Sequence, residues 1–343
     1  MAAAVTTTID GGRPDGTDDG RADESRATGA VLPIRPWIPE GRIVPLPGRG
    51  EAFARTHGLG SGRPTVLLLH GWLATADLNW FNLYRTLGER YAFVAPDHRG
   101  HGRGIRSPQP FTIEDAADDA DALLEALGVE RAIVVGYSMG GPIAMRLTER
   151  HPDRVDALVL TATALEWRAH LFDRLRWRFL AALSAALRAG AGEWAFRSLV
   201  DETARTDELV AAWRTHLIGE VKRGHVTDAI AAGHALAEWD FREGARALHV
   251  PTAAVITGSD RLVDVRRQRQ LALEIGAHEI VLDDADHDAA FRLPGRYADA
   301  VMEAIDTVAD AHAQRAARPR RPLRPRRRWR LRRGRQRARR RNG

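Results

Sequence analysis

The chain has 343 residues and a formal net charge of +6, and 44% of it is apolar, enough for one large or two ordinary domains. Because there is no cysteine, the sequence excludes disulfide bonds, thiolate nucleophiles and cysteine metal sites. No apolar run reaches the length of a membrane span, and the first residues lack the pattern of a secretory signal, so we expect a cytoplasmic protein.

The two ends of the chain differ in composition from the region between them. Residues 1–36 are rich in Gly, Asp, Thr and Ala, have little to bury and are expected to be disordered. Residues 314–343 hold sixteen arginines and no acid, so removing their charge from the +6 of the whole chain leaves −10. We expect this Arg-rich tail to be disordered and to contact polyanions non-specifically, through the charge of their phosphates. A nucleic-acid binder that acts through the tail stays an alternative.

Between these ends, β-prone pieces at 42–46 and 51–55 predict an opening hairpin. Strand and helix patterns then alternate along the chain. Strands are expected at residues 65–69, 91–95, 132–135, 157–161, 251–257 and 279–282. Helices are expected at residues 79–90, 112–127, 142–150, 265–275 and 297–313. Such alternation predicts an α/β fold with a mostly parallel sheet and helices on both of its faces.

Residues 166–248 interrupt this alternation with a helix-like stretch that is rich in Trp and Arg. The insertion follows the strand after the helix at 142–150, where it can arch over the carboxyl edge of the sheet. We therefore predict a helical cap at 166–248 and a core built from two parts, 37–165 and 249–313.

The central motif is Gly136-Tyr137-Ser138-Met139-Gly140, which stands between an apolar strand and a helix. A sharp turn from strand to helix strains the residue at the turn and brings its flanks close to neighbouring backbone, which calls for glycines on both sides. The turn exposes the Oγ of Ser138 at the carboxyl edge of the sheet and aims the first helical amides at a bound group. We predict that Ser138 is a nucleophile.

A serine hydroxyl near neutral pH needs a base, and the base needs an acid that orients it. Two loops after downstream strands supply candidates, with Asp260 following the strand at 251–257 and His287 following the next strand. We predict His287 as the general base and then acid, held in the right tautomer by Asp260. Two alternatives stay open: Asp260 caps the turn before a helix, and Glu166 is the acid.

Acyl transfer also needs hydrogen-bond donors for the oxyanion that develops. We predict the backbone N–H of Met139, directly after the nucleophile, and that of Trp72 in the His70-Gly71-Trp72 loop. A metal at His98 and His101 is the alternative use of nearby histidines, but no further ligand lies at matching spacing. We expect those two histidines to belong to a scaffold loop, and we expect no metal.

Five segments in this order resemble the α/β-hydrolase fold superfamily, in its cap-bearing esterase and lipase-like branch. They are residues 68–72, 96–102, 136–141, 258–263 and 286–287. The resemblance covers about residues 43–313 and implies hydrolysis of an ester, thioester or similar acyl group on a Ser-His-Asp triad, without a cofactor. Carbon–carbon bond hydrolases, lactonases and cofactor-free haloperoxidases share this triad and remain alternatives, as does a non-catalytic ligand receptor.

The aromatic side chains of the cap indicate what the substrate is like. Some of them are expected to line an apolar acyl site, so we predict a small to medium, fairly apolar ester as substrate. The residues predicted to bind it are Trp72, Tyr137 and Trp167. The oligomeric state is not predicted.

Overall fold

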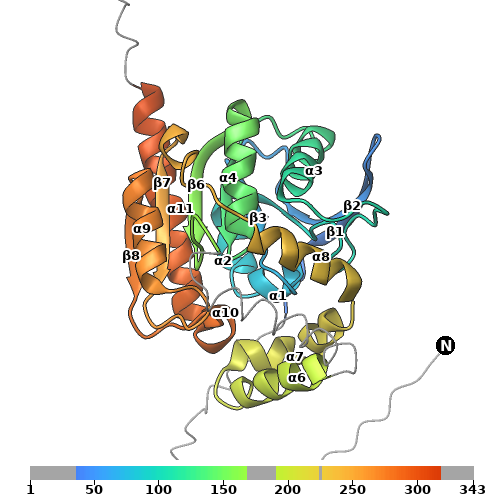
Figure 1. Cartoon of the computed structure of the whole chain (residues 1–343). Helices are drawn as coiled ribbons and strands as arrows, with labels where there is room; N and C mark the ends of the chain where they lie inside the picture. Colours follow the sequence, from blue (N-terminus) through green and yellow to red (C-terminus); the bar gives the residue numbers. More distant parts are fainter. Residues whose placement is uncertain (1–35, 168–190, 224–225, 318–343) are drawn as a thin grey trace, which may run out of the picture. The chain divides into compact units, whose positions relative to one another are not determined.

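The computed structural model of the protein describes residues 36–167, 191–223 and 226–317 (Figure 1). The disorder predicted for 1–35 and 318–343 concerns residues outside these ranges, and so does the part of the predicted cap at 168–190. Within the described ranges, the apolar stretches of the helices are too short or too interrupted by charge to cross a membrane.

The described strands form an eight-stranded sheet in the order β1-β2-β4-β3-β5-β6-β7-β8. β2 pairs antiparallel with both β1 and β4, and the other neighbours pair in parallel. This confirms the predicted opening hairpin and the mostly parallel sheet. The strands are β1 (Glu40–Leu46), β2 (Gly50–His57), β3 (Thr65–Leu69), β4 (Ala92–Pro96), β5 (Ala132–Tyr137), β6 (Val155–Thr161), β7 (Thr252–Thr257) and β8 (His278–Leu282).

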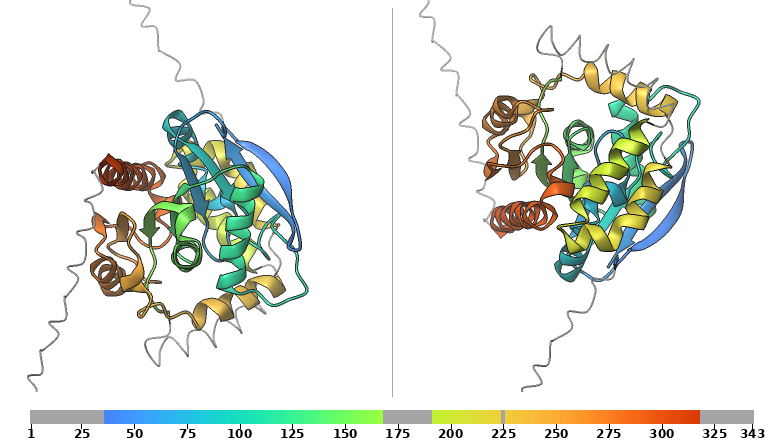
Figure 2. Two further views of the ribbon diagram at one scale, coloured as in Figure 1. Left: turned by 90° about the horizontal axis from the view of Figure 1, so that it is seen from above. Right: turned by 90° about the horizontal axis from the view of Figure 1, so that it is seen from below.

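Successive side chains of a strand point to opposite faces of the sheet, and each face packs against its own helices (Figure 2). In β3, Val66 and Leu68 join one core cluster, while Leu67 and Leu69 join the other. The first cluster includes α1 (Ala76–Trp80), α2 (Tyr84–Arg90) and α11 (Pro294–Ala317). The second includes α3 (Ile113–Ala126), α4 (Gly140–Arg150) and α9 (Val265–Ile275).

The order of the strands reverses between β3 and β5, because the chain places β4 on one side of β3 and β5 on the other. In open α/β sheets, ligands bind beyond the carboxyl ends of the strands at such a switch point. The loop after β3 holds residues 70–72, and the turn after β5 holds Ser138. The sheet order therefore brings both predicted segments to this point of its edge.

Helix boundaries follow local signals in most places. α3 begins after Thr112, whose hydroxyl accepts the N–H of Asp115 at 2.9 Å, as expected for a helix start. The helix predicted at 79–90 is instead two helices, α1 and α2, with a turn at 81–83. At this turn the amide of Asn82 donates to the carbonyl of Ala290 at 3.0 Å, a long-range contact that helical spacing does not show.

Most of the described residues between β6 and β7 are helical, which confirms the predicted helical insertion after β6, the strand that follows α4. They form α6 (Ala191–Thr203), α7 (Glu208–Val221), α8 (Val226–Ala237) and the short η2 (Ala245–Ala247). Shorter elements elsewhere are η1 (Pro152–Arg154) and α10 (Ala289–Arg292). α11 continues to Ala317, so residues 314–317 are helical and not part of a disordered tail.

Candidate active site

Ser138 stands in the sharp turn between β5 and α4, which we call the elbow. Its φ is 52°, a left-handed conformation that is uncommon outside glycine. Its N–H donates to the carbonyl of Thr161 at 2.9 Å, which ties the turn to β6. A Cβ at Gly136 would lie 2.4 Å from the carbonyl oxygen of Gly140, and one at Gly140 would lie 2.1 Å from that of Leu69. Close backbone approach therefore requires a glycine on each side of the serine.

The fold brings His287, from the loop after β8, and Asp260, from the loop after β7, to Ser138. Nε2 of His287 lies 3.0 Å from Oγ of Ser138, and Nδ1 lies 2.9 Å from Oδ2 of Asp260. Ser138 is buried, and the side chain of His287 is 17% exposed. The three residues form one hydrogen-bonded line, although they are far apart in the sequence.

The carboxylate of Asp260 is fully buried, and donors satisfy both of its oxygens. Oδ1 accepts the backbone N–H groups of residues 262–263, each at 2.8 Å. Oδ2 accepts the hydroxyl of Thr257 at 2.7 Å and the amide of Gln268 at 3.1 Å, and it faces His287. The two roles considered for Asp260, capping the turn and orienting His287, are thus compatible. Oδ1 caps the turn, and Oδ2 contacts the imidazole.

Glu166, the alternative acid, has other partners. It forms an isolated β-bridge with Asp240, and its carboxylate pairs with the guanidinium of Arg242 at 3.4 Å. The Nδ1 of His287 is bound by Asp260 instead. The structure therefore brings only one of the two candidate acids to the imidazole.

Tyr137, predicted to contact substrate, is buried and contacts His287. Its hydroxyl donates to the backbone carbonyl of His287, and the two rings pack with centroids 5.4 Å apart. Burial raises the pKa of the Tyr137 phenol well above its usual value, so the hydroxyl keeps its proton and donates. The N–H of His287 donates to Oδ1 of Asp286 at 2.7 Å, so the N–H and the carbonyl of His287 are both hydrogen-bonded. Sequence reasoning missed this role because the two segments are far apart along the chain.

Residues 70–72 after β3 carry the predicted donor of Trp72, and this loop, which we call the oxyanion loop, lies directly against the elbow. A Cβ at Gly71 would lie 3.3 Å from the Cβ of Ser138 and 2.9 Å from the ring of Tyr137. The N–H of Gly71 donates to Oδ1 of Asn79, the first helix's own side chain, at 2.7 Å. The backbone that carries the predicted oxyanion donor is therefore fixed close to the serine.

Trp72, Met139 and Trp167 take different positions around the elbow. The indole Nε1 of Trp72 donates to the carbonyl of Ala229 in α8 at 2.6 Å, which joins the oxyanion loop to the cap. The side chain of Met139 is fully buried and packs in the second core cluster. Trp167 is also buried in that cluster, so a substrate-binding role for it stays a prediction.

The histidines near this loop form a scaffold. The N–H of His98 donates to Nε2 of His70 at 2.9 Å, so the proton of His70 is on Nδ1, which donates to the carbonyl of Gly71 at 2.8 Å. Burial lowers the pKa of His70 well below its usual value and lowers that of His98 to about 3. Both rings are therefore neutral near pH 7 and fixed by hydrogen bonds.

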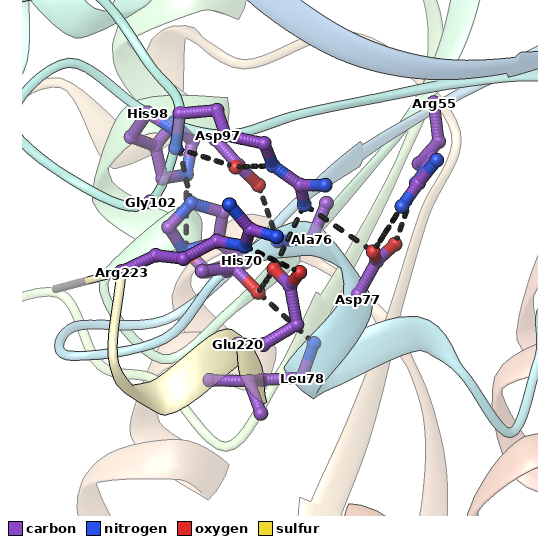
Figure 3. A network of polar contacts seen from close by, with 12 residues as sticks. Arg55, His70, Ala76, Asp77, Leu78, Asp97, His98, Gly102, Glu220 and Arg223 are labelled. Carbon is purple, nitrogen blue, oxygen red and sulfur yellow. Dashed lines mark hydrogen bonds and ion pairs between the residues drawn. The ribbon is translucent and has the colours of Figure 1, made fainter. Parts of the chain in front are cut away.

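A buried ionic network links the cap to the core beside this scaffold (Figure 3). Asp77 in α1 is fully buried and accepts from Arg55 at 2.7 Å, Arg103 at 3.2 Å and His216 of α7 at 2.9 Å. Although burial opposes ionisation, the hydrogen bonds of His216 and Arg55 and the nearby positive charges hold the pKa of Asp77 well below its usual value. The carboxylate is therefore ionised near pH 7.

Glu220 of α7 is the second buried carboxylate of this network. It accepts from Arg103 at 2.8 Å, from the hydroxyl of Thr75 at 3.1 Å and from Arg223 at 2.9 Å. Breaking a buried charge pair leaves an uncompensated charge in the interior, which is costly. These contacts therefore hold α7 against α1 and the loop after β4.

Among the described residues, one group could offer three ligand atoms to a metal ion: Asp77, His216 and Glu220. The same carboxylates accept hydrogen bonds from Arg55, Arg103 and other donors. A bound cation would lie next to two guanidinium groups, whose charge repels it. The group fits an ionic link between core and cap better than a metal centre.

Known proteins resemble the chain in sequence and in fold. The putative carbamate hydrolase RutD of Caulobacter segnis is 39% identical over 102 residues, which are 29% of this chain and 38% of that protein. The AB hydrolase superfamily protein YisY of Bacillus subtilis is 28% identical over 235 residues, which are 65% of this chain and 84% of that protein. The esterase EaEST of Exiguobacterium antarcticum has a TM-score of 0.66 at 18% identity, covering 78% of this chain and all of that one.

The match to RutD spans 38% of that protein's length, and the likeness to the esterase, at 18% identity, concerns the fold alone. A family model carries more weight because it covers most of the core. The model of the alpha/beta hydrolase fold family matches residues 64–292, a range that includes β3, the elbow, Asp260 and His287. The chain therefore belongs to the alpha/beta hydrolase fold family.

Proposed function

We propose that the protein is a serine hydrolase that cleaves a small to medium, fairly apolar carboxylic ester through an acyl-enzyme. The observation that carries this proposal is the line from Asp260 through His287 to Ser138, with contacts of 2.9 and 3.0 Å. A neutral imidazole whose Nδ1–H points to the carboxylate presents the lone pair of Nε2 to the serine hydroxyl. This is the arrangement that a serine nucleophile requires.

In the acylation step, Oγ of Ser138 attacks the ester carbonyl carbon while Nε2 of His287 takes the hydroxyl proton. The tetrahedral oxyanion accepts hydrogen bonds from the N–H groups of Met139 and Trp72. His287 then gives its proton to the leaving alkoxide oxygen, the carbon–oxygen bond breaks and an alcohol departs. The product is an acyl group on Ser138.

In the deacylation step, Nε2 of His287 takes a proton from water, whose oxygen attacks the acyl carbon. The second oxyanion is bound by the same two N–H groups. Its collapse breaks the bond to Oγ of Ser138, which recovers a proton from His287, and the carboxylic acid is released. Asp260 accepts from Nδ1 throughout and stabilises the imidazolium in both steps.

An apolar substrate is supported by the side chains that follow Gly71. Trp72 is partly buried against the cap helix α8, and Leu73 is 48% exposed with a φ of 60°. A non-glycine residue in the left-handed region is strained, and such strain concentrates at functional sites.

Carbon–carbon bond hydrolases, lactonases and haloperoxidases of this fold would use the same three residues, so the substrates tested must include theirs.

The test is covalent labelling of the full chain with a fluorophosphonate, followed by mass spectrometry of the adduct. We expect one adduct at Ser138 and none in Ser138→Ala or His287→Ala. Turnover of p-nitrophenyl esters of increasing chain length, a lactone and a vinylogous diketone then ranks the reactions. Labelling at another residue, or ester turnover that survives Ser138→Ala, would contradict the mechanism. A folded chain with no labelling at all would favour a ligand receptor.

A further inference from the structure

Two backbone carbonyls beside the nucleophile each accept a hydrogen bond from a buried side chain outside the proposed triad. The hydroxyl of Thr163 donates to the carbonyl of Ser138 at 2.8 Å, and Nδ1 of His70 donates to the carbonyl of Gly71 at 2.8 Å. Each carbonyl belongs to the peptide bond whose N–H is a proposed oxyanion donor, that of Met139 or that of Trp72.

We infer that Thr163 is a positioning residue for catalysis, which holds the Ser138–Met139 peptide so that its N–H faces the oxyanion. This inference rests on the proposed serine hydrolase function. The peptide group is planar, so fixing its carbonyl oxygen fixes the direction of the N–H on the opposite side. A hydrogen bond to the carbonyl also polarises the N–H and strengthens it as a donor.

The end of β6 places Thr163 for this contact. The residue is 2% exposed and follows Ala162, whose φ of 50° turns the chain sharply after the strand. The N–H of Ala162 donates to the carbonyl of Val255 in β7 at 3.3 Å, which ties the turn to the sheet. The hydroxyl therefore comes from the turn after β6, which is hydrogen-bonded to the neighbouring strand.

The second glycine after the elbow makes room for this hydroxyl. A Cβ at Gly141 would lie 2.4 Å from Oγ1 of Thr163, a separation that side-chain atoms do not tolerate. The N–H of Gly141 also donates to the carbonyl of Ser138 at 2.9 Å. The carbonyl of Ser138 thus has two donors, one from α4 and one from the turn after β6.

The oxyanion loop has a matching arrangement, although it comes from a different part of the sheet. His70 is fully buried, and its Nε2 is occupied by the N–H of His98, so only Nδ1 can donate to Gly71. Both proposed donor peptides therefore have their carbonyls held by buried side chains. A purely local packing role for Thr163 would not explain why the same contact recurs at the second donor.

The test compares Thr163→Val, which removes the hydroxyl and keeps the shape, with Thr163→Ser, which keeps the hydroxyl. Both are measured in the full chain with a p-nitrophenyl ester. We expect Thr163→Val to lower kcat on the order of 10-fold with little change in KM, less than the 10²–10³-fold for loss of a donor itself. Its affinity for a trifluoromethyl ketone, which forms a tetrahedral adduct, should fall by a similar factor. Thr163→Ser should restore both values.

The outcomes separate this inference from the proposed function. If turnover depends on Ser138 but Thr163→Val has the wild-type kcat and ketone affinity, the inference is wrong and the hydrolase proposal stands. Equal losses in Thr163→Val and Thr163→Ser would also overturn it, because they would point to packing. If the wild-type chain shows no turnover that depends on Ser138, both proposals fail. Should Thr163→Val not fold, Thr163→Ala replaces it in the comparison with Thr163→Ser.

Discussion

The hydroxyl of Tyr137 donates to the backbone carbonyl of His287. Tyr137 directly precedes the proposed nucleophile Ser138, and His287 is its proposed base. This bond links the elbow after β5 to the loop after β8, in addition to the contact between Nε2 of His287 and Oγ of Ser138. The position of the imidazole then depends on a strand that is central in the sheet, and not only on its own loop.

Removing this hydroxyl tests the link. In Tyr137→Phe the carbonyl of His287 loses its donor, and the loop that carries the imidazole is held less firmly. Since one hydrogen bond contributes about 0.5–1.5 kcal/mol, we expect kcat to fall by up to about 10-fold with KM nearly unchanged. The control is Tyr91→Phe, because the hydroxyl of Tyr91 bonds to Asp306 on α11 instead. Equal kcat values in the two variants would argue against the link.

The identity of the acid is tested by a second pair of variants. In Asp260→Asn the side chain no longer favours the imidazole tautomer that accepts the serine proton. We expect kcat for ester hydrolysis to fall about 10⁴-fold, while circular dichroism shows an intact fold. Glu166→Gln should keep wild-type activity, because its carboxylate pairs with Arg242. The reverse ranking of the two variants would make Glu166 the acid.

Space at the oxyanion loop is tested by adding one methyl group. In Gly71→Ala the new Cβ meets the Tyr137 ring at 2.9 Å and the Cβ of Ser138 at 3.3 Å, so the loop must move away from the elbow. We expect a loss of kcat on the order of 10²-fold, as for a lost oxyanion donor. Gly219→Ala is the matched control, since a Cβ at that helical glycine has open space around it. It should leave activity unchanged and stabilise the fold slightly, by about 0.5–1 kcal/mol.

Because the carboxylate of Asp77 is buried and ion-paired, we expect the free energy of unfolding to depend on pH. Its folded pKa lies below the value of 3.8 for the free side chain, so its contribution is present above that pH and is lost as pH falls toward the folded pKa. Asp77→Asn should lower the free energy of unfolding by about 3 kcal/mol near pH 7, measured in urea. The difference from wild type should shrink below about pH 4.

A surface pair provides the control for this experiment. Asp201 pairs with Arg214 at 2.6 Å in an exposed position, so Asp201→Asn should leave the free energy of unfolding nearly unchanged. A similar loss in the two variants, or a difference for Asp77→Asn that grows in acid, would show that the buried network does not stabilise the link between cap and core.

The Arg-rich tail can be removed after Ala317, where the described part of α11 ends. Because the proposed catalytic residues lie between 72 and 287, we expect kcat and KM for a p-nitrophenyl ester to be unchanged. Affinity for heparin or single-stranded DNA at low salt should fall steeply, since phosphate or sulfate charge is the only proposed attraction. A truncated chain that binds DNA as well as the full chain would place the attraction elsewhere.

Several features of the fold were predictable from the sequence because their causes are local. The strand at 65–69 and the helix at 265–275 follow apolar runs and helical spacing, and the structure has both with these bounds. The helix predicted at 79–90 was wrong in its continuity: the chain turns at 81–83, where Phe81 packs against Trp213 and Phe291. Those partners come from the cap and from α10, and spacing within one helix carries no information about them.

The sequence by itself determined the order of strands and helices, the elbow with its glycines, and a short set of candidate site residues that included two possible acids. These depend on backbone sterics and on side-chain periodicity, which act over a few residues. Only the tertiary structure decided that Asp260 and not Glu166 meets His287, that Tyr137 and Thr163 hold backbone carbonyls, and that α7 is tied to the core by buried charge. Each of these depends on which remote segments the sheet order brings within hydrogen-bond distance, because a side chain's partner is set by the packing of the whole domain.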